Sequence, residues 1–361
     1  MLMNVQILRA FAACLVVWAH LSELFPGSSL LRYTPYGLEG VDLFFVISGF
    51  IMVYTTSQRV TGPLAFLFRR FLRIAPLYYL ATLLVILIFL VMPAAFKSTE
   101  VDLPSMVKSA LFIPYQKSEG RIYPLYYLGW TLNYEMFFYL MFSIAIWLRY
   151  QLRTYICSAI ILALTIAGLF IHADEYGILA YVYTRPIMLD FVLGMLIAQS
   201  ADVLLAKTNR NTGLYVSLGV VGFVLMFSLN KIFDPAYTIA PITNTFFTQG
   251  VPAAMLVLGA VLLEKAGRAT GRNWLTALGD ASYSLYLFHF FMVAVIIKIC
   301  DRFLVPEIGR AGVALVSLPL ICLASYVIYV LLEKPMHRFS SKIRFTARRD
   351  KHVVATDTTG R

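Results

Sequence analysis

Long apolar stretches separated by short polar breaks run along nearly the whole chain. An α-helix rises about 1.5 Å per residue, so about 20 apolar residues are needed to cross roughly 30 Å of hydrocarbon. About ten stretches reach this length. They predict membrane spans at residues 5–25, 41–57, 76–93, 125–148, 154–172, 178–198, 212–230, 246–264, 275–299 and 311–332. The expected fold class is all-α, a polytopic transmembrane helical bundle.

The composition supports a membrane protein. Hydrophobic residues make up 60% of the 361 positions and charged residues 14%, which lies outside the usual range of soluble globular domains. Because the spans take up almost the whole chain, no segment of domain size remains for a soluble catalytic module. We therefore expect one membrane domain, residues 1–335, that builds any site from its own helices and short loops. A basic cytoplasmic tail, residues 336–361, follows it.

The placement of the basic residues predicts the orientation of the chain. Of the 30 Lys and Arg residues, 19 lie in alternate connections and only eight in the opposite set. The rich set consists of residues 58–75, 149–153, 199–211, 265–274 and 333–361. Cytoplasmic loops of membrane proteins carry an excess of Lys and Arg, so these connections and both termini are predicted to be cytoplasmic.

Charge and cysteine usage also limit the partners of the chain. The basic residues from Lys334 to Lys351 are typical of a segment that lies against anionic membrane lipid, with substrate binding as the alternative. Nucleic acid is not expected, because no folded basic domain presents a groove-sized surface. The four cysteines lie in or beside apolar stretches without metal-site or redox spacing, so we expect small core residues and no metal.

Arg9 and His20 lie in the first span, where a charge costs roughly 2.5 to 3.5 kcal/mol even on a lenient scale. Their separation of eleven residues corresponds to about 1100° of rotation, so both side chains lie on one helix face with a rise of roughly 16 Å between them. The two side chains could line a polar path through the membrane. Arg9 would then bind an anionic ligand near the cytoplasmic side, and the imidazole of His20 would act deeper inside. Alternatively, the two side chains extend to the two membrane interfaces.

The second span opens with Asp42 and continues to the small residues Ser48 and Gly49. Small residues let two helices approach closely, and an aspartate can cap a helix start. Asp42 and Ser48 can equally form the wall of a polar pocket. The sequence leaves both interpretations open.

Three arginines, Arg69, Arg70 and Arg73, stand at the cytoplasmic edge of the third span. A guanidinium group binds phosphate with two parallel hydrogen bonds, so this cluster could hold a phosphorylated ligand. A topological anchor at the inner membrane surface is the alternative.

Glu135 lies about ten residues into the fourth span, near the middle of the membrane. A carboxylate at this depth needs a partner or a proton, and Arg185 and His20 are the possible partners. Arg185 and Asp190 in the sixth span raise the same question. A structural ion pair fits this pattern, and so does a general acid/base or a carboxylate that orients an imidazole.

In the ninth span, Ser282, Tyr286 and His289 follow one another at intervals of four and three residues. These intervals place the three side chains on one helix face. Such a polar stripe can bind substrate, or it can satisfy hydrogen bonds between helices.

Taken in order, these motifs resemble those of the acyltransferase 3 family of membrane O-acyltransferases. The shared features are Arg9 and His20 with ten residues between them, GVDLFFVISGF at 40–50, the Arg70 and Arg73 pair, WTLNYE at 130–135 leading into Phe138 and Tyr139, SYSLYLFH at 282–289 and Glu-Lys-Pro at 333–335. The resemblance covers almost the entire chain. Within the family, the chain looks most like the stand-alone members that acetylate exopolysaccharide.

The resemblance implies a bacterial inner-membrane enzyme that moves an acetyl group from cytoplasmic acetyl-CoA to a hydroxyl of a cell-surface or exopolysaccharide glycan, often lipid-linked. Arg70 and Arg73, with Arg69, would lie near the phosphates of the donor, and Arg9 and His20 would line the acyl path. We expect His20 and Glu135 to be catalytic. We expect substrate contacts from Arg9, Arg69, Arg70, Arg73, Asp42, Ser48, Arg185, Tyr286 and His289.

Histidine suits such a reaction because an imidazole accepts and releases a proton at neutral pH. His20 could take the hydroxyl proton of the acceptor, or it could attack the thioester itself and carry the acyl group. The sequence does not choose between these roles.

Two other functions fit a polar path through the membrane. One is a transporter that exports a small acid or an acylated glycan, and the other is a structural partner in a polysaccharide-assembly complex. A purely structural protein has little reason to keep so many costly polar residues in its spans, which favours a functional cavity. Only the family resemblance separates the enzyme from the transporter.

Overall fold

The computed structural model describes residues 2–23, 39–93, 101–170, 176–232, 245–303 and 305–342. In these ranges the regular structure is helical, apart from one isolated bridge between Gln116 and Ile122. The α-helices are α1 (Met3–Glu23), α3 (Glu39–Gln58), α4 (Pro63–Val91), α5 (Leu103–Ala110), α6 (Trp130–Leu148), α7 (Arg153–Ala167), α9 (Ile178–Tyr183), α10 (Leu189–Lys207), α11 (Thr212–Ile232), α13 (Val251–Lys265), α14 (Trp274–Asp280), α15 (Ser282–Phe303), α16 (Val305–Ile328) and α17 (Lys334–Lys342).

The predicted fold class, a polytopic bundle of about ten spans, is confirmed. Within the described ranges, nine helices are long and apolar enough to cross a membrane, and the bent pair of α14 and α15 would make a tenth. The two helices of this pair meet at 79°. The cytoplasmic position of both termini stays a prediction, and residues 343–361 of the basic tail lie outside the described residues.

The outer surface of the bundle is apolar, as a lipid-facing surface must be. Large aliphatic side chains on separate helices are half-exposed or more, for example Leu83 on α4 (50%), Val220 on α11 (54%) and Leu323 on α16 (62%). Buried polar side chains lie instead between helices, which is where an all-helical membrane protein can satisfy them.

The third span starts earlier than predicted, at Pro63 instead of residue 76. Pro63 occupies the first turn of α4, where a missing N–H has no cost. Pro76 lies inside the helix, which continues through it. The prediction that Arg69, Arg70 and Arg73 lie in a polar connection between spans is wrong, because all three lie within the single helix α4.

The sixth span is displaced in the opposite direction, toward the C-terminus. The prediction of 178–198 is wrong because the chain breaks between Tyr183 and Pro186, leaving a short helix α9 and a membrane helix that runs on to Lys207. Arg185 precedes Pro186 and is extended, with ψ at 141°. A residue before proline is disfavoured in the helical region, so the break follows from the sequence itself.

The closest packing in the core joins α3 to α10. A Cβ atom added to Gly49 would lie 2.1 Å from the Phe191 carbonyl oxygen, and one added to Gly194 would lie 1.9 Å from that of Val46. Only glycine fits at these two crossings, because any side chain would overlap the backbone of the other helix. The close approach predicted at Gly49 is therefore found.

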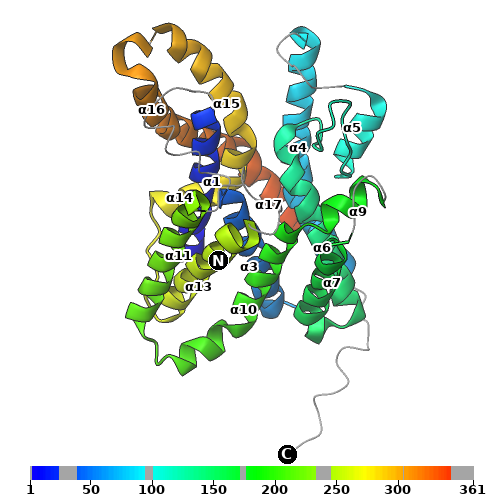
Figure 1. Cartoon of the computed structure of the whole chain (residues 1–361), viewed down its shortest axis with the longest axis vertical. Coiled ribbons are helices and arrows are strands. Elements are labelled where there is room, and N and C mark those ends of the chain that lie inside the picture. The colour runs from blue at the N-terminus through cyan, green and yellow to red at the C-terminus, as the bar shows by residue number, and fades with distance from the viewer. Residues whose placement is uncertain are drawn as a thin grey trace, which may run out of the picture.

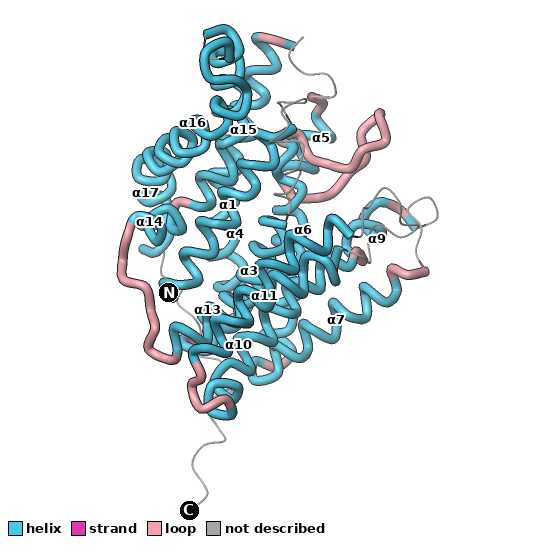
Figure 2. The backbone as a smooth tube through the Cα atoms, turned by 60° about the vertical axis from the view of Figure 1, so that its left-hand side comes forward, coloured by secondary structure: helices cyan, strands magenta, loops and turns pink. Residues whose placement is uncertain are grey.

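Helix α1 lies in the middle of the molecule, beside α3, α14 and α15 (Figures 1 and 2). Both carboxylate oxygens of Glu264 accept backbone N–H groups of the first turn, from Met3 and Asn4, at 2.7 Å. A carboxylate at a helix N-terminus satisfies unpaired N–H groups and complements the helix dipole. Further along, Gln6 donates a hydrogen bond to Asp280, and these contacts fix the depth at which α1 presents Arg9.

Candidate active site

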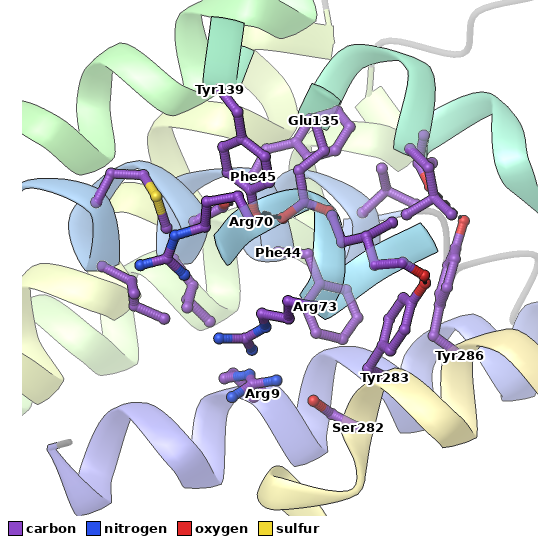
Figure 3. Close-up of a pocket in the computed structure, with 18 residues that line it drawn as sticks. Arg9, Phe44, Phe45, Arg70, Arg73, Glu135, Tyr139, Ser282, Tyr283 and Tyr286 are labelled. Atoms are coloured by element: carbon purple, nitrogen blue, oxygen red, sulfur yellow. Dashed lines mark hydrogen bonds between the residues drawn. The ribbon is translucent and has the colours of Figure 1, made fainter. Parts of the chain in front are cut away.

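A pocket of about 80 Å³ lies inside the bundle between α1, α3, α4, α6 and α15 (Figure 3). One wall is cationic, a second carries a carboxylate, and aromatic and aliphatic side chains close the remainder. The polar and aromatic lining residues are Arg9, Phe44, Phe45, Ser48, Arg70, Arg73, Thr131, Glu135, Tyr139, Ser282, Tyr283 and Tyr286. Residues that are far apart in the chain thus converge on one internal site.

The cationic wall is formed by Arg9, Arg70 and Arg73. Figure 3 shows Arg73 directly facing Arg9, with Arg70 on the same side of the pocket. Arg70 donates a hydrogen bond to the Thr55 hydroxyl at 3.2 Å, and Arg9 donates to the Gln6 side chain at 3.0 Å. Within the described residues, neither Arg70 nor Arg73 forms a salt bridge with a carboxylate.

Gathering three guanidinium groups in a low-dielectric site is unfavourable unless an anion joins them. Arg70 and Arg73 keep several N–H donors that have no acceptor among the described residues, and such donors suit phosphate or carboxylate oxygens. A wall of this chemistry can hold a negatively charged ligand.

Arg69 does not belong to this wall. It is exposed and does not line the pocket, although it is the immediate neighbour of Arg70. Successive residues of a helix point about 100° apart, so α4 directs Arg70 and Arg73 inward and leaves Arg69 at the surface.

Glu135 forms the opposite wall of the pocket. Its Oε1 atom accepts hydrogen bonds from the Ser48 hydroxyl, at 3.1 Å, and from the Tyr139 hydroxyl. The predicted interaction of Glu135 with Arg185 or His20 is wrong, because α6 turns the Glu135 side chain away from both residues. Tyr139 was not expected as a pocket residue, although its position four residues after Glu135 places it on the same helix face.

The polar stripe of α15 is divided between two places. Ser282 and Tyr286 line the pocket, whereas His289 lies beyond it. The Tyr286 hydroxyl forms hydrogen bonds with the Thr131 hydroxyl at 2.6 Å and with the Leu128 carbonyl at 2.9 Å. These bonds hold α15 against the start of α6.

His289 is paired with His20. The Nε2 atom of His289 lies 3.4 Å from Nδ1 of His20, and the two ring centroids are 5.0 Å apart. Both residues are buried, with exposed fractions of 0% and 6%. Tyr286, whose ring centroid lies 6.3 Å from that of His289, connects this pair to the pocket.

Neighbouring carbonyl groups determine which ring nitrogens carry protons. Nδ1 of His289 lies 2.7 Å from the Tyr286 carbonyl oxygen, and Nδ1 of His20 lies 2.8 Å from that of Val16. A carbonyl oxygen can only accept, so in the neutral rings both Nδ1 atoms carry the hydrogen. His289 then turns the lone pair of its Nε2 toward His20, and Nε2 of His20 keeps a lone pair that can accept a proton.

Arg9 and His20 lie at different positions along α1. Arg9 lines the pocket, whereas His20 lies outside its lining, farther along α1 and near its C-terminal end. The rings of Tyr127 and Phe290 lie 6.5 and 5.8 Å from the His20 ring. The imidazole thus sits in an aromatic surrounding at the other end of α1 from Glu264.

Two predicted site residues lie elsewhere. Asp42 is 3% exposed and is not among the residues that line the pocket, so the structure does not place it in the wall where it was expected. Arg185 stacks on the Tyr181 ring at 4.1 Å in a separate pocket on the far side of α6. Arg185 and Asp190 do not form an ion pair with each other.

Thr131 and Tyr283 also line the pocket, although neither was expected as a site residue from the sequence. Both residues lie within motifs that carry the family resemblance, close to residues that were expected in the site.

A metal site is a separate question. The described residues contain no group of three or more His, Cys, Asp or Glu side chains that could hold an ion.

Comparison with known proteins places this arrangement in a family. Residues 4–330 match the model of an acyltransferase domain, Acyl_transf_3. The chain belongs to this acyltransferase family. It is therefore an acyltransferase and a multi-pass membrane protein, and the matched region includes all the helices that form the pocket.

Curated relatives agree with this membership. The exopolysaccharide production protein ExoZ of Rhizobium meliloti is 34% identical over 314 residues, which cover 86% of this chain and 93% of that protein. The acyltransferase MdmB of Streptomyces mycarofaciens is 26% identical over 93% of this chain and 92% of its own. The O-acetyltransferase OatA of Staphylococcus aureus is 25% identical over 92% of this chain and 56% of its own. No solved structure matches the chain.

Proposed function

We propose that this acyltransferase moves an acetyl group from cytoplasmic acetyl-CoA to a hydroxyl of a cell-surface or exopolysaccharide glycan, which is presented as a lipid-linked intermediate in the bacterial inner membrane. The observation that carries the proposal is the position of Tyr286, which lines the pocket with the cationic wall on one side and lies beside the His20–His289 pair on the other. Residues 1–335 form the acyltransferase domain in this proposal, and residues 336–361 form a cytoplasmic tail.

The cationic wall supports acetyl-CoA as the donor. Coenzyme A carries a diphosphate and a 3′-phosphate, and guanidinium groups bind such oxyanions with two parallel hydrogen bonds. Arg9 lies near the N-terminal end of α1 and Arg70 and Arg73 near that of α4, at the membrane face predicted to be cytoplasmic. The donor would thus enter from the side where it is made.

The histidine pair supports base catalysis at His20. In this mechanism Nε2 of His20 takes the proton of the acceptor hydroxyl while the oxygen attacks the thioester carbonyl carbon. The C–S bond then breaks, and the proton passes to the coenzyme A thiolate. The alternative, in which Nε2 attacks the thioester and carries the acetyl group before passing it on, uses the same lone pair.

His289 supports either role of His20. The Nδ1–H of His20 donates to the Val16 carbonyl, and the Nε2 lone pair of His289 lies 3.4 Å from the same Nδ1 atom, where it would help to stabilise the imidazolium that forms when His20 takes a proton. We assign His289 as a positioning residue, because its Nε2 atom contacts His20 and would act on the reaction through that residue. Glu135, which lines the pocket beside Ser48 and Tyr139, would act on the donor side.

The relatives support a glycan as acceptor. ExoZ is named for exopolysaccharide production and OatA as an O-acetyltransferase. The similarity to ExoZ covers almost all of both chains, so the same kind of acceptor is proposed here, together with contact to the machinery that assembles the polysaccharide.

The proposal can be tested in proteoliposomes that contain the purified protein. Radiolabelled acetyl-CoA is supplied on one side and de-O-acetylated surface polysaccharide from the source bacterium on both sides. The wild type is expected to label the polysaccharide, and His20→Ala should lower the rate by roughly 10²- to 10⁴-fold, the usual contribution of a general base. Folded His20→Ala protein is verified by its retained binding of acetyl-CoA.

Two results would count against the proposal. If the wild type transfers no acetyl group to any glycan, the acceptor or donor class is wrong. If His20→Ala transfers acetyl groups at the wild-type rate, the proposed chemistry at His20 is wrong.

A further inference from the structure

A second polar pocket, of about 300 Å³, lies on the other side of α6 from Glu135. Its chemically distinctive lining residues are Trp130, Asn133, Tyr134, Tyr181 and Arg185. We propose that this pocket binds a carboxylate-bearing sugar of the acceptor glycan, adjacent to the sugar that receives the acetyl group. The inference rests on the proposed function and adds the chemical class of the acceptor.

Arg185 supplies the charge of the pocket. The extended backbone before Pro186 carries it off the end of α9, and its guanidinium lies 4.1 Å from the centroid of the Tyr181 ring. The side chain is half-buried and, in the part of the chain that the structure describes, forms no hydrogen bond or ion pair. Stacking leaves the N–H edge of a guanidinium available, and a carboxylate is the planar partner that fits this edge.

Asn133 provides an independent sign of a ligand. It is 3% exposed, and its Oδ1 atom has no hydrogen-bond partner among the described residues. An unsatisfied buried acceptor costs about 1–3 kcal/mol, so such atoms are rare without a function. A sugar hydroxyl that donates to Oδ1 would remove this cost.

Aromatic rings complete the site. Trp130 and Tyr134 meet edge to face, with centroids 6.0 Å apart, and Tyr181 lies under the guanidinium. Aromatic side chains offer flat apolar surfaces together with polar edges, which match the alternating C–H and hydroxyl faces of a sugar ring. A small free anion would use Arg185 but would leave these surfaces uncovered.

The position of the pocket makes it a subsite of the acceptor rather than the reaction centre. Trp130 begins α6 only three residues after Tyr127, whose ring lies 6.5 Å from that of His20. Asn133 and Glu135, however, are about 200° apart around α6 and face different pockets. A glycan that reaches His20 with one sugar could therefore place a neighbouring sugar beside Arg185.

Defined oligosaccharides can test this inference without the native acceptor. Full-length protein in nanodiscs is titrated with trigalacturonate and with its counterpart in which the carboxyl groups are reduced to alcohols. The wild type is expected to bind the acid at least tenfold more tightly. Arg185→Gln should lose this preference, whereas Arg149→Gln, the same charge change at the exposed far end of α6, should keep it.

Asn133→Leu separates hydrogen bonding from charge. It should weaken the binding of both oligosaccharides and leave the preference for the acid intact. The inference is overturned if the wild type shows no preference for the acid, or if the preference survives in Arg185→Gln. The proposed function would fail in a different way, with no acetyl transfer from acetyl-CoA to any glycan while the preference dependent on Arg185 persists.

Discussion

At the scale of single residues, neighbours on one helix have different surroundings. Arg70 and Arg73 line the internal pocket, whereas Arg69 is exposed to the outside. The motif therefore contains two residues that face the pocket and one that faces the outside. This division gives a direct test of the cationic wall, because Arg69 is a matched control for Arg70.

Arg70→Gln and Arg73→Gln are each expected to raise the KM for acetyl-CoA about tenfold or more, with a smaller change in kcat. A hydrogen bond to a charged group contributes about 1.5–3 kcal/mol, and 1.4 kcal/mol corresponds to a factor of ten. Arg69→Gln should leave the KM near the wild-type value. Steady-state kinetics with purified protein would measure all three, and an equal effect at Arg69 would contradict the assignment.

His289 should affect catalysis through His20 alone. His289→Gln keeps an acceptor that can face Nδ1 of His20, whereas His289→Leu removes it. We expect kcat to fall roughly tenfold to a hundredfold in His289→Leu and less in His289→Gln, with the KM for acetyl-CoA unchanged in both. A general packing defect would instead lower both variants equally and raise the KM.

The sequence predicted the members of the site better than their pairings. Motif positions such as Arg9, Arg70 and Glu135 do line one pocket. Their partners could not be foreseen, because side chains such as Ser48 reach Glu135 only through contacts between helices that are distant in the chain. The helix periodicity that relates Glu135 to Tyr139 was available in the sequence and was overlooked.

At the scale of helices, the crossing of α3 and α10 lies beside the pocket, since the lining residue Ser48 is the immediate neighbour of Gly49. Hydrophobic patterning located most spans correctly. It failed where local rules overrode it, at the extended residue before Pro186 and at the arginine-bearing start of α4. The bend between α14 and α15 also has no signature in the average hydropathy.

Gly49→Ala and Gly194→Ala are expected to reduce sharply the yield of folded protein, because each new Cβ would lie about 2 Å from a backbone oxygen of the other helix. Gly219→Ala on α11 is the control, since nothing lies within 4 Å of a Cβ at that position. Fluorescence-detected size-exclusion chromatography and thermal melting would compare them. Wild-type stability in Gly49→Ala would contradict the observed packing.

At the scale of the whole molecule, the proposed reaction depends on which membrane face each site lies toward. The cationic wall lies toward one face and the histidine pair and the second pocket toward the other, so donor and acceptor would approach from opposite sides. The distribution of basic residues assigns the first face to the cytoplasm.

Labelling with a membrane-impermeant maleimide can check this assignment. Ser118→Cys, in the exposed loop between α5 and α6, is expected to react in intact spheroplasts. Gln151→Cys, between α6 and α7, should react only after lysis. The reverse pattern would invert the predicted topology and place the cationic wall away from cytoplasmic acetyl-CoA.

The central claim is that His20 performs acetyl transfer to a surface glycan, and the O-acetyl content of that glycan in a deletion strain tests it most directly. The strain is complemented with wild-type or His20→Ala protein at equal levels of folded protein in the membrane. The account predicts that the wild type restores O-acetylation and that His20→Ala leaves the glycan as unacetylated as the deletion does. Full O-acetylation with His20→Ala would contradict it.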